Sequence, residues 1–399
     1  MPGFELFGEA EKAQVQDVLD SGVLMRYGFD GMRKGHWKAQ ELEQAFSKRM
    51  QTKYTQVLSS GTAALTVALQ SAGVGAGDEV IMPTFTFVAS FESIIAIGAV
   101  PILVDIDDTL TLAPEAVEKA ITKKTKVVMP VHMCGSMADL AALKAICLKH
   151  KLLLLEDACQ AIGGTYEGKP LGSYGDLGCF SFDYVKTITC GEGGALITNN
   201  ETYYKNADHY SDHGHDHIGK DRGAESHPFL GYNFRISELN AAVGCAQIKR
   251  LDSFLEIQKK NYTILRDVLK GIDGLTFRRV PDRGVENYSF LNFFLPTEES
   301  TRKAHKALVE SGVDVCFYWY DNNWHYYRKW QHLTNLTSLG KLPKDLTENL
   351  PNYNKADFSK SDFWMGRTIS SLVKLSWTEE EVSKRAKLMT RVITESLKD

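Results

Sequence analysis

Short apolar runs alternate with helix-like segments between residues 54 and 199, and this alternation limits the fold more than any other feature of the chain. The apolar runs lie at residues 80–82, 102–104, 126–131, 152–156, 179–182 and 195–198. Helical patterns fall between several of them, at residues 62–72, 114–121 and 137–150. Continuously apolar strands separated by helices are typical of a mainly parallel sheet that is covered on both faces. We therefore predict an α/β fold with such a sheet at its centre.

The rest of the chain predicts a second, smaller domain. Residues 237–265 form a long amphipathic segment, the pattern of a helix that links a large domain to a smaller one. Strand-like runs then follow at residues 275–278, 290–295 and 313–318, before a final helical pattern at 379–396. We predict a large domain over residues 1–250, which includes the N-terminal segment, and a small C-terminal α+β domain over residues 251–399.

Charge and composition exclude several classes of protein. Lys plus Arg number 46 and Asp plus Glu number 50, so the net charge of −4 gives no overall attraction for nucleic acid or an anionic membrane. The first residues lack the basic start and apolar run of a secretory signal, and the apolar stretch at 94–104 is too short to span a bilayer. The seven cysteines form no CxxC pair, which favours reduced thiols. We expect a cytoplasmic protein without membrane insertion.

Three segments carry residues that are suited to chemistry, and the first is SSGTAAL at residues 59–65. Serine, glycine and threonine here open a helix directly after a strand-like run. The N-terminus of a helix offers unpaired N–H groups and a partial positive charge, so this turn is a candidate phosphate seat. A plain helix cap explains the same residues.

The second segment is LLLEDACQ at residues 153–160. Its leucines form a buried strand that ends in two acids, and ligands of open α/β sheets bind at that edge. A buried carboxylate is costly unless it is paired, so Asp157 is expected to meet a cation such as a protonated heterocycle. The alternative is a strand-end acid that caps the next helix.

The third segment, at residues 182–194, contains Lys186 before a glycine-rich turn. Few charges surround this lysine, which is poorly explained by a solvated surface position. A desolvated lysine amine is a nucleophile for Schiff-base chemistry. A lysine that extends its amine to solvent from an apolar surface is the alternative.

The order of the three segments is more specific than any one of them. A pyridoxal phosphate enzyme needs a phosphate cradle, an acid at the pyridine nitrogen, a Schiff-base lysine and a group that stacks on the ring. Phe87, in the segment PTFTF, supplies an aromatic ring in the region where the last group is needed. The sequence therefore predicts this cofactor.

At this point the chain resembles the DegT/DnrJ-type sugar aminotransferases, a branch of the fold-type I pyridoxal phosphate enzymes. The resemblance covers nearly the whole chain and rests on SSGTAAL, DEVIMPTFTFVAS, VPILVDID, LLLLEDACQAIGG, FSFDYVKTITCGEGGALITNN and GYNFRISELNAA. It implies that Lys186 is the catalytic lysine that binds the cofactor covalently, that Asp157 contacts the ring nitrogen and that Gln160 lies against the ring.

The same resemblance implies the phosphate ligands and a shared site. The residues expected to hold the phosphate are Ser60, Gly61, Thr62 and Ser181. Asn233, in the GYN motif, is expected to reach the phosphate of a second subunit, which implies a homodimer with shared active sites. Glutamate is the amino donor that the resemblance implies, and a keto- or aldehyde-sugar is the acceptor.

Three stretches, at residues 25–33, 211–222 and 317–326, differ from the common members that act on nucleotide sugars. They are similar to the branch that aminates C8 of 8-oxo-3,8-dideoxy-manno-octulosonate, a sugar of lipopolysaccharide. Such a substrate carries a carboxylate and no nucleotide. Four cations are candidates to bind the carboxylate: Arg26, Arg33, Lys220 and Arg222. Three further residues are expected to contact the sugar: His213, Tyr318 and His325.

Other interpretations stay open at this level. A nucleotide-linked 4-keto-6-deoxy sugar is the alternative acceptor. A sugar dehydratase of the same fold is less consistent, because dehydratase relatives carry histidine where Lys186 stands. A non-catalytic regulator could keep the fold, but the set Lys186, Asp157 and Gln160 argues against lost catalysis. The alternation of His213, His215 and His217 favours a loop over the substrate rather than a metal site, because no cysteine adjoins it.

Overall fold

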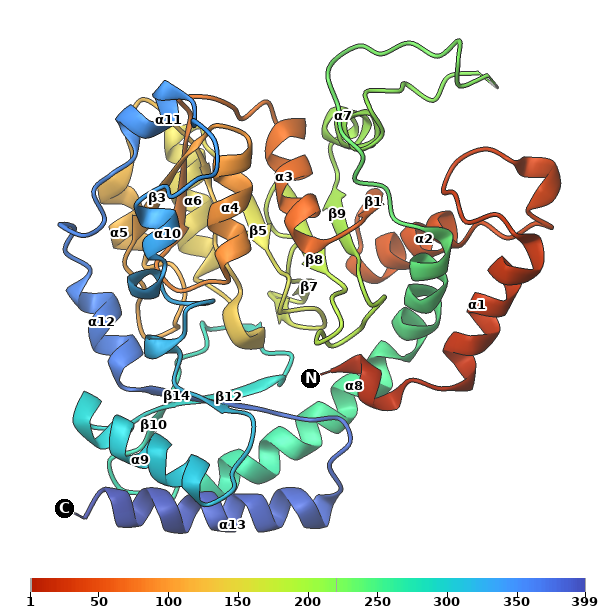
Figure 1. Ribbon diagram of the computed structural model, residues 1–399. Coiled ribbons are helices and arrows are strands. Elements are labelled where there is room, and N and C mark those ends of the chain that lie inside the picture. Colours follow the sequence, from red (N-terminus) through yellow and green to blue (C-terminus); the bar gives the residue numbers. More distant parts are fainter. Residues whose placement is uncertain (1, 220, 399) are drawn as a thin grey trace.

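The computed structural model describes residues 2–219 and 221–398. Its first half forms a seven-stranded sheet with the strand order β1-β9-β8-β5-β4-β2-β3 (Figure 1). The strands are β1 (Tyr54–Leu58), β2 (Glu79–Pro83), β3 (Val100–Val104), β4 (Thr125–Val128), β5 (Leu153–Asp157), β8 (Leu177–Ser181) and β9 (Gly194–Thr198). All are parallel except β9, which runs antiparallel to β1 and β8. The predicted α/β fold with a mainly parallel sheet is confirmed.

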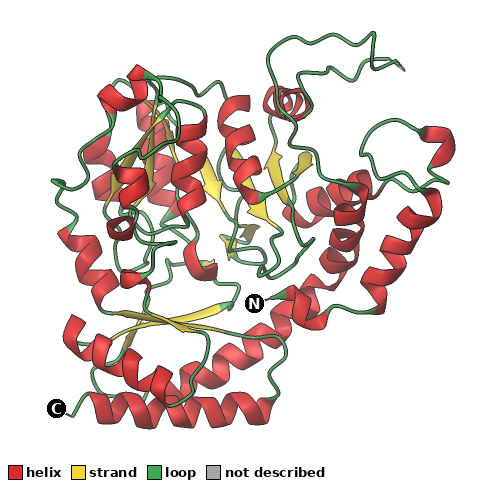
Figure 2. Cartoon of the chain, in the orientation of Figure 1, coloured by secondary structure: helices red, strands yellow, loops and turns green. Residues whose placement is uncertain are grey.

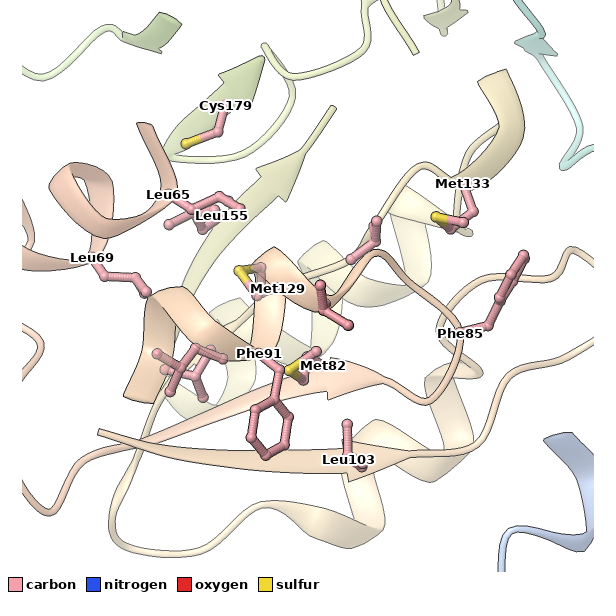
Figure 3. Packing of buried hydrophobic residues seen from close by; sticks show 14 of the residues in the cluster. Leu65, Leu69, Met82, Phe85, Phe91, Leu103, Met129, Met133, Leu155 and Cys179 are labelled. Atoms are coloured by element: carbon pink, nitrogen blue, oxygen red, sulfur yellow. The ribbon is translucent and has the colours of Figure 1, made fainter. Parts of the chain in front are cut away.

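Side chains of successive strand residues point to opposite faces of this sheet and enter different cores. Leu155 and Cys179 pack with helices α3 (Gly61–Ser71) and α4 (Val88–Ala96) on one face, as Figure 3 shows. Leu154, the neighbour of Leu155, packs on the other face with α5 (Pro114–Ala120) and α6 (Leu140–His150). The continuous apolar character of the strands therefore follows from burial on both sides.

Helices at the chain's N-terminus and beyond β9 complete the covering layers. They are α1 (Glu9–Ser21), α2 (Lys38–Met50) and α7 (Glu201–Ser211). The loop that follows α7 projects away from the body before the chain enters α8 (Glu238–Leu269), a helix of 32 residues (Figure 1). The first half of α8 packs on the main sheet through Cys245 and Leu251, and its last turns join a second core through Leu265.

The second half of the chain builds an antiparallel sheet in the order β10-β12-β14-β13, which lies apart from the main sheet in Figure 2. Its strands are β10 (Thr276–Phe277), β12 (Phe290–Phe294), β13 (Cys316–Phe317) and β14 (Thr368–Leu372). Helices α9 (Glu298–Glu310) and α13 (Glu379–Ser396) cover it together with the end of α8. A small sheet of β11 (Gly284–Val285), β6 (Thr165–Tyr166) and β7 (Lys169–Pro170) connects the two parts.

Several elements differ from the sequence prediction. β14 was not predicted because its sequence, TISSL, lacks an apolar run; Ser370 is nevertheless fully buried, and its hydroxyl bonds to the side chain of Asn292. β13 covers only residues 316–317 of the expected 313–318, because pairing with β14 ends there. The predicted domain boundary at residue 250 falls inside the continuous helix α8.

The remaining elements are short. They are the 3-10 helices η1 (Gly3–Leu6), η2 (Asp30–Met32), η3 (Met133–Gly135), η4 (Trp319–Asp321) and η5 (Tyr327–Lys329), and the helices α10 (Gln331–Thr334), α11 (Lys344–Asn349) and α12 (Ser359–Gly366). No helix in the described part of the chain has both the length and the apolar character needed to cross a membrane.

Candidate active site

A pocket of about 250 Å³ lies where the parallel strands β1, β2, β5 and β8 end. Ligands of open α/β sheets bind at this carboxyl edge. Nine residues with predicted roles line the pocket: Ser60, Gly61, Thr62, Phe87, Asp157, Gln160, Ser181, Lys186 and His325. The structure thus gathers side chains that are far apart in the sequence, and their individual roles stay predictions.

The turn from β1 into α3 forms one end of the pocket. Ser60 caps the helix, since its hydroxyl accepts a hydrogen bond of 3.0 Å from the amide of Ala63. The next amides, of Gly61 and Thr62, lie in the first turn, where a helix offers no carbonyl partners. A Cβ atom at residue 61 would lie 2.7 Å from Cβ of Ser181, so this close approach of α3 to β8 requires glycine. Amides, hydroxyls and a helix N-terminus together fit a phosphate.

Asp157 lines the pocket as the last residue of β5, and it is only 4% exposed. Its amide donates to the carbonyl of Pro130, and its carbonyl accepts from His132. The carboxylate accepts from the amide of Cys159 at 3.1 Å and from the hydroxyl of Ser90 at 2.8 Å. A carboxylate has about four lone-pair sites, so two bonds leave room for a donor in the pocket. A protonated ring nitrogen fits this position.

Gln160 faces the same pocket from the turn after β5. Its side-chain oxygen accepts from the amide of Cys134 at 3.0 Å, and its carbonyl accepts from the side chain of Asn287 at 3.1 Å. The first bond fixes the orientation of the amide, because an amide N–H can donate only to the oxygen end. The NH₂ end is therefore the one that remains for a ligand.

Lys186 lies on the loop that follows β8, and it lines the pocket next to Asp183 and Glu192. The N-terminal segment braces this loop from outside. The amide of Gly3 donates to the carbonyl of Lys186 at 2.9 Å, and the ring of Phe4 stacks on Tyr184 at 4.2 Å. The backbone position of the lysine therefore depends on residues at the start of the chain.

Aromatic rings and His325 form the wall that faces Lys186. Phe87 stacks on Trp324, with ring centroids 5.6 Å apart, and Trp319 lies 4.3 Å from His325. The Nδ1 atom of His325 lies 2.9 Å from the side-chain oxygen of Asn322, which can only accept, so Nδ1 carries the proton. Burial and the nearby Lys186 lower the pKa of His325 to about 3. The imidazole is therefore neutral at physiological pH and presents Nε2 as an acceptor.

Tyr318 and Asn233 do not line this pocket. Tyr318 is buried behind the aromatic wall, and its hydroxyl donates to the carbonyl of Gly366 at 3.0 Å. Asn233 is exposed on the projecting segment between α7 and α8, and its side-chain oxygen accepts from the amide of Arg235 at 3.3 Å. The sequence resemblance predicted that Asn233 serves a second subunit, and its place outside this chain's own pocket leaves that prediction in place.

Arg33 and Arg26 are internal anchors of the segment at residues 25–33. Arg33 is fully buried, donates to the carbonyls of Gly28 and Met25, and lies 3.4 Å from the carboxylate of Glu238. Arg26 is 4% exposed and donates to Glu43 at 2.6 Å. Buried charges must be paired, and these two arginines are paired within the fold, away from the pocket. The structure does not bring either one to the predicted sugar site.

The segment at residues 211–222 is organised around the buried carboxylate of Asp212. It accepts from His217 at 2.9 Å, from Arg222 at 2.9 Å and from Arg235. Although burial opposes it, these bonds hold the pKa of Asp212 well below its usual range. His213 is exposed on the same segment. Lys220 lies outside the described residues.

His217 connects the segment at residues 211–222 to helix α7 and to Tyr27. Its Nδ1 lies 2.7 Å from Asp208, its Nε2 bonds to Asp212, and its ring stacks on Tyr27 at 4.2 Å. Burial favours the neutral form, but the bonds to Asp208 and Asp212 raise the pKa of His217 to about 9. The histidine is therefore a cation between two carboxylates at physiological pH.

This pairing predicts a pH-dependent stability. An unfolded histidine titrates near pH 6.5, so the stabilisation is complete below pH 6.5 and is lost as the pH rises towards 9. His217→Gln should lower the free energy of unfolding by roughly 1–3 kcal/mol at pH 6.5 and by much less above pH 9. Urea unfolding of both proteins at the two pH values measures this difference. The exposed His227 supplies the control His227→Gln, and an equal loss at both pH values would contradict the prediction.

Three residues that support Asp157 and Lys186 in the pocket were not predicted from the sequence. Ser90 holds Asp157, Thr86 bonds to Ser90, and Gly3 braces the loop of Lys186. No helix was predicted at residues 86–90, so the four-residue spacing that brings Thr86 and Ser90 together in the fold carried no signal in the sequence. No local signal indicates the contact of Gly3, which joins residues far apart in the chain.

The chain is similar in sequence and in structure to known aminotransferases and related synthases. Residues 6–384 match the DegT/DnrJ/EryC1/StrS aminotransferase family. GDP-perosamine synthase of Escherichia coli O157:H7 is 37% identical over 268 residues, which cover 65% of this chain and 70% of that protein. 3-Amino-5-hydroxybenzoate synthase of Amycolatopsis mediterranei (strain S699) is 35% identical over 316 residues, 78% of this chain and 79% of that protein. The crystal structure of an aminotransferase from Psychrobacter cryohalolentis superimposes with a TM-score of 0.84 at 27% identity, covering 98% of each chain.

Proposed function

Because the chain belongs to the DegT/DnrJ/EryC1/StrS aminotransferase family, we propose that it transfers an amino group from glutamate to the C8 aldehyde of 8-oxo-3,8-dideoxy-manno-octulosonate. The product is the 8-amino form of a lipopolysaccharide sugar. The family itself establishes a pyridoxal-phosphate-dependent aminotransferase, which acts on an amino donor and a keto substrate. The identities of donor and acceptor are the proposal.

The pocket supplies each group that pyridoxal phosphate requires. The amides of Gly61 and Thr62 and the hydroxyl of Ser181 would hold the phosphate, and Asp157 would face the ring nitrogen at the other end. Phe87 and Gln160 would lie against the ring. When bound, the cofactor supplies an aldehyde that takes up the amino group and a ring that accepts the electron pair released at the donor.

The chain's own residues then hold and move protons. The amine of Lys186 acts as the general base that removes the proton from the Cα atom of the donor. When the same half-reaction runs in reverse, the protonated amine acts as the acid that returns a proton to that atom. The carboxylate of Asp157 keeps a proton on the ring nitrogen through charge attraction. His325, neutral and with Nε2 as an acceptor, binds a hydroxyl of the sugar.

The acceptor is inferred from two stretches that the fold joins into one unit. Tyr27, from residues 25–33, stacks on His217, from residues 211–222, and donates to Asp208 at 2.8 Å. Arg222 lies over the same tyrosine ring at 5.6 Å. Both belong to the three stretches that resembled the octulosonate branch. The contacts between the two stretches support a specialised acceptor site. Of the described candidates Arg26, Arg33 and Arg222, only Arg222 has a side chain that is substantially exposed, at 34%, so we assign the carboxylate of the acceptor to it.

A second subunit completes the proposed site. Of the described residues that line the pocket, none is an arginine, whereas glutamate and the octulosonate both carry carboxylates. Members of the family are typically dimers. We therefore propose that Asn233 and Arg222 reach the pocket of the partner subunit, where the projecting segment would deliver them.

The alternative acceptor is a nucleotide-linked 4-keto-6-deoxy sugar. One relative is named GDP-perosamine synthase, which favours it, whereas another is named 3-amino-5-hydroxybenzoate synthase, for a product that carries a carboxylate and no nucleotide. Purified protein should be assayed with glutamate and each acceptor in turn. Turnover of the octulosonate aldehyde and little reaction with the nucleotide sugar is the expected result, and the reverse preference would replace the proposal with the alternative.

Arg222→Gln tests the proposed bond to the carboxylate of the acceptor. Without this charge-assisted bond, the KM for the acceptor should rise by about ten- to a hundredfold. The formation of 2-oxoglutarate from glutamate without acceptor should stay nearly unchanged, because the donor step does not involve the sugar. Arg283→Gln removes an exposed arginine that pairs with Glu167, outside the pocket, and serves as the control. An unchanged acceptor KM in Arg222→Gln would remove this residue from the site.

A further inference from the structure

A chain of two hydroxyl groups, from Thr86 and Ser90, leads to the carboxylate of Asp157. The hydroxyl of Ser90 lies 2.8 Å from Oδ2 of Asp157, and the hydroxyl of Thr86 lies 2.6 Å from that of Ser90. Ser90 is in the first turn of α4, and Thr86 immediately precedes Phe87, the residue that caps this helix. All three side chains are buried, with at most 4% exposed.

The direction of the hydrogen bonds follows from the number of protons. An ionised carboxylate can only accept, so Ser90 must donate to Asp157. A serine hydroxyl has a single proton, and the oxygen of Ser90 is therefore left to accept from Thr86. The order is Thr86 to Ser90 to Asp157. The Thr86 hydroxyl also lies 3.3 Å from the carbonyl of Phe87, but its contact with Ser90, at 2.6 Å, is the shorter one.

The segment that carries these hydroxyls is also held in place. The amide of Thr86 donates to the carbonyl of His325 at 3.0 Å, and that of Val88 donates to the carbonyl of Trp324 at 2.9 Å. The hydroxyl chain is therefore anchored to the same loop that forms the aromatic wall. This rigidity gives the Ser90 hydroxyl a fixed place from which to orient a carboxylate.

We propose that Ser90 is a positioning residue for Asp157, and that Thr86 sets the direction of the Ser90 hydroxyl. The bond holds Oδ2 so that the remaining lone pairs of the carboxylate point into the pocket, towards the ring nitrogen of the cofactor. The inference rests on the proposed role of Asp157. A carboxylate without this bond can rotate, and it then meets the ring nitrogen with poorer geometry.

The test compares two ligands for the apoenzyme: pyridoxal phosphate and its analogue in which CH replaces the ring nitrogen. Both keep the phosphate and the aldehyde, and only the first offers a nitrogen to Asp157. Dissociation constants are measured from the change in protein fluorescence. Ser90→Ala should weaken the binding of pyridoxal phosphate by about 5- to 20-fold and that of the analogue by less than about twofold. Thr86→Val should give the same pattern with a smaller effect.

Ser93→Ala is the matched control. Ser93 lies on the same helix and is fully buried, but its hydroxyl donates to the carbonyl of Ser90 at 3.0 Å. This variant should leave both dissociation constants within about twofold of the wild type, because the bond that it removes does not involve the carboxylate. Equal weakening of both ligands by Ser90→Ala would overturn the proposal, and if that variant does not fold, the same comparison with Thr86→Val decides.

Asp157→Asn separates this inference from the proposed function. It should weaken pyridoxal phosphate more than the analogue. If it does not distinguish the two ligands, the proposed role of Asp157 fails. If it does distinguish them while the Ser90 and Thr86 variants do not, only the positioning role of Ser90 is wrong.

Discussion

Lys186→Ala is expected to reduce glutamate-dependent amination by at least about 10⁴-fold, because it removes both the nucleophile and the general base. No other lysine lines the pocket among the described residues. The variant should still bind pyridoxal phosphate, since the phosphate and ring contacts come from other elements. Turnover at saturating glutamate, compared with the wild type, gives the measurement.

The site of covalent attachment provides an independent check of this lysine. Borohydride reduction of the wild-type protein loaded with pyridoxal phosphate should fix the cofactor on the peptide that contains Lys186. Lys186→Arg is the control that keeps the positive charge and loses the nucleophile, and it should be as inactive as the alanine variant. Cofactor fixed on a different lysine, or substantial turnover in either variant, would contradict the assignment.

Asp157→Asn is expected to lower kcat by about 10²- to 10³-fold, the typical loss when one charge-stabilising group is removed from an active site. A neutral amide cannot hold a proton on the ring nitrogen, so the ring accepts the electron pair less well. Single-turnover formation of 2-oxoglutarate measures the affected step. Asp183→Asn is the control, since Asp183 also lines the pocket but its carboxylate accepts from the amide of Val185. Equal losses in the two variants would argue against a specific role for Asp157.

The main sheet could be predicted because its strands carry their own signal. β2, β5 and β9 are buried on both faces, so apolar residues fill the body of each strand and polar residues lie only at the strand ends. β14 gave no such signal, because three of its residues are hydroxylic yet buried: Thr368 donates to the carbonyl of Trp364 in α12, Ser370 bonds to Asn292 of β12, and Ser371 is fully buried. A strand whose burial depends on partners elsewhere in the chain cannot be recognised from its own residues.

The residues predicted to hold the cofactor could be picked out because each lies at a recognisable junction; the structure brings them to one pocket, and their roles stay predictions. Gly61 begins a helix, Asp157 ends a strand and Lys186 precedes a glycine-rich turn, and parallel strands bring such junctions to one edge. Ser90 was missed because a serine in a helical turn is common, and only the fold reveals the carboxylate beside it.

The residues proposed to bind the sugar were harder to predict, because the sequence does not show whether a charged side chain is buried or exposed. Arg33 is as strongly charged as Arg222, yet it is fully buried between two carbonyls and Glu238. An arginine that anchors a loop and one that binds a ligand have the same sequence signature. The three-dimensional arrangement therefore reduces the candidates, and in the proposed dimer the place of the second subunit determines which of them reach a pocket.

The formation of 2-oxoglutarate by protein loaded with pyridoxal phosphate, supplied with glutamate and no acceptor, tests the central claim most directly. A transaminase completes half of its reaction under these conditions and then stops. The account predicts about one 2-oxoglutarate per chain, and continued release after the octulosonate aldehyde is added. Absence of 2-oxoglutarate from protein that has bound the cofactor on Lys186 would contradict the claim that this pocket transfers an amino group from glutamate.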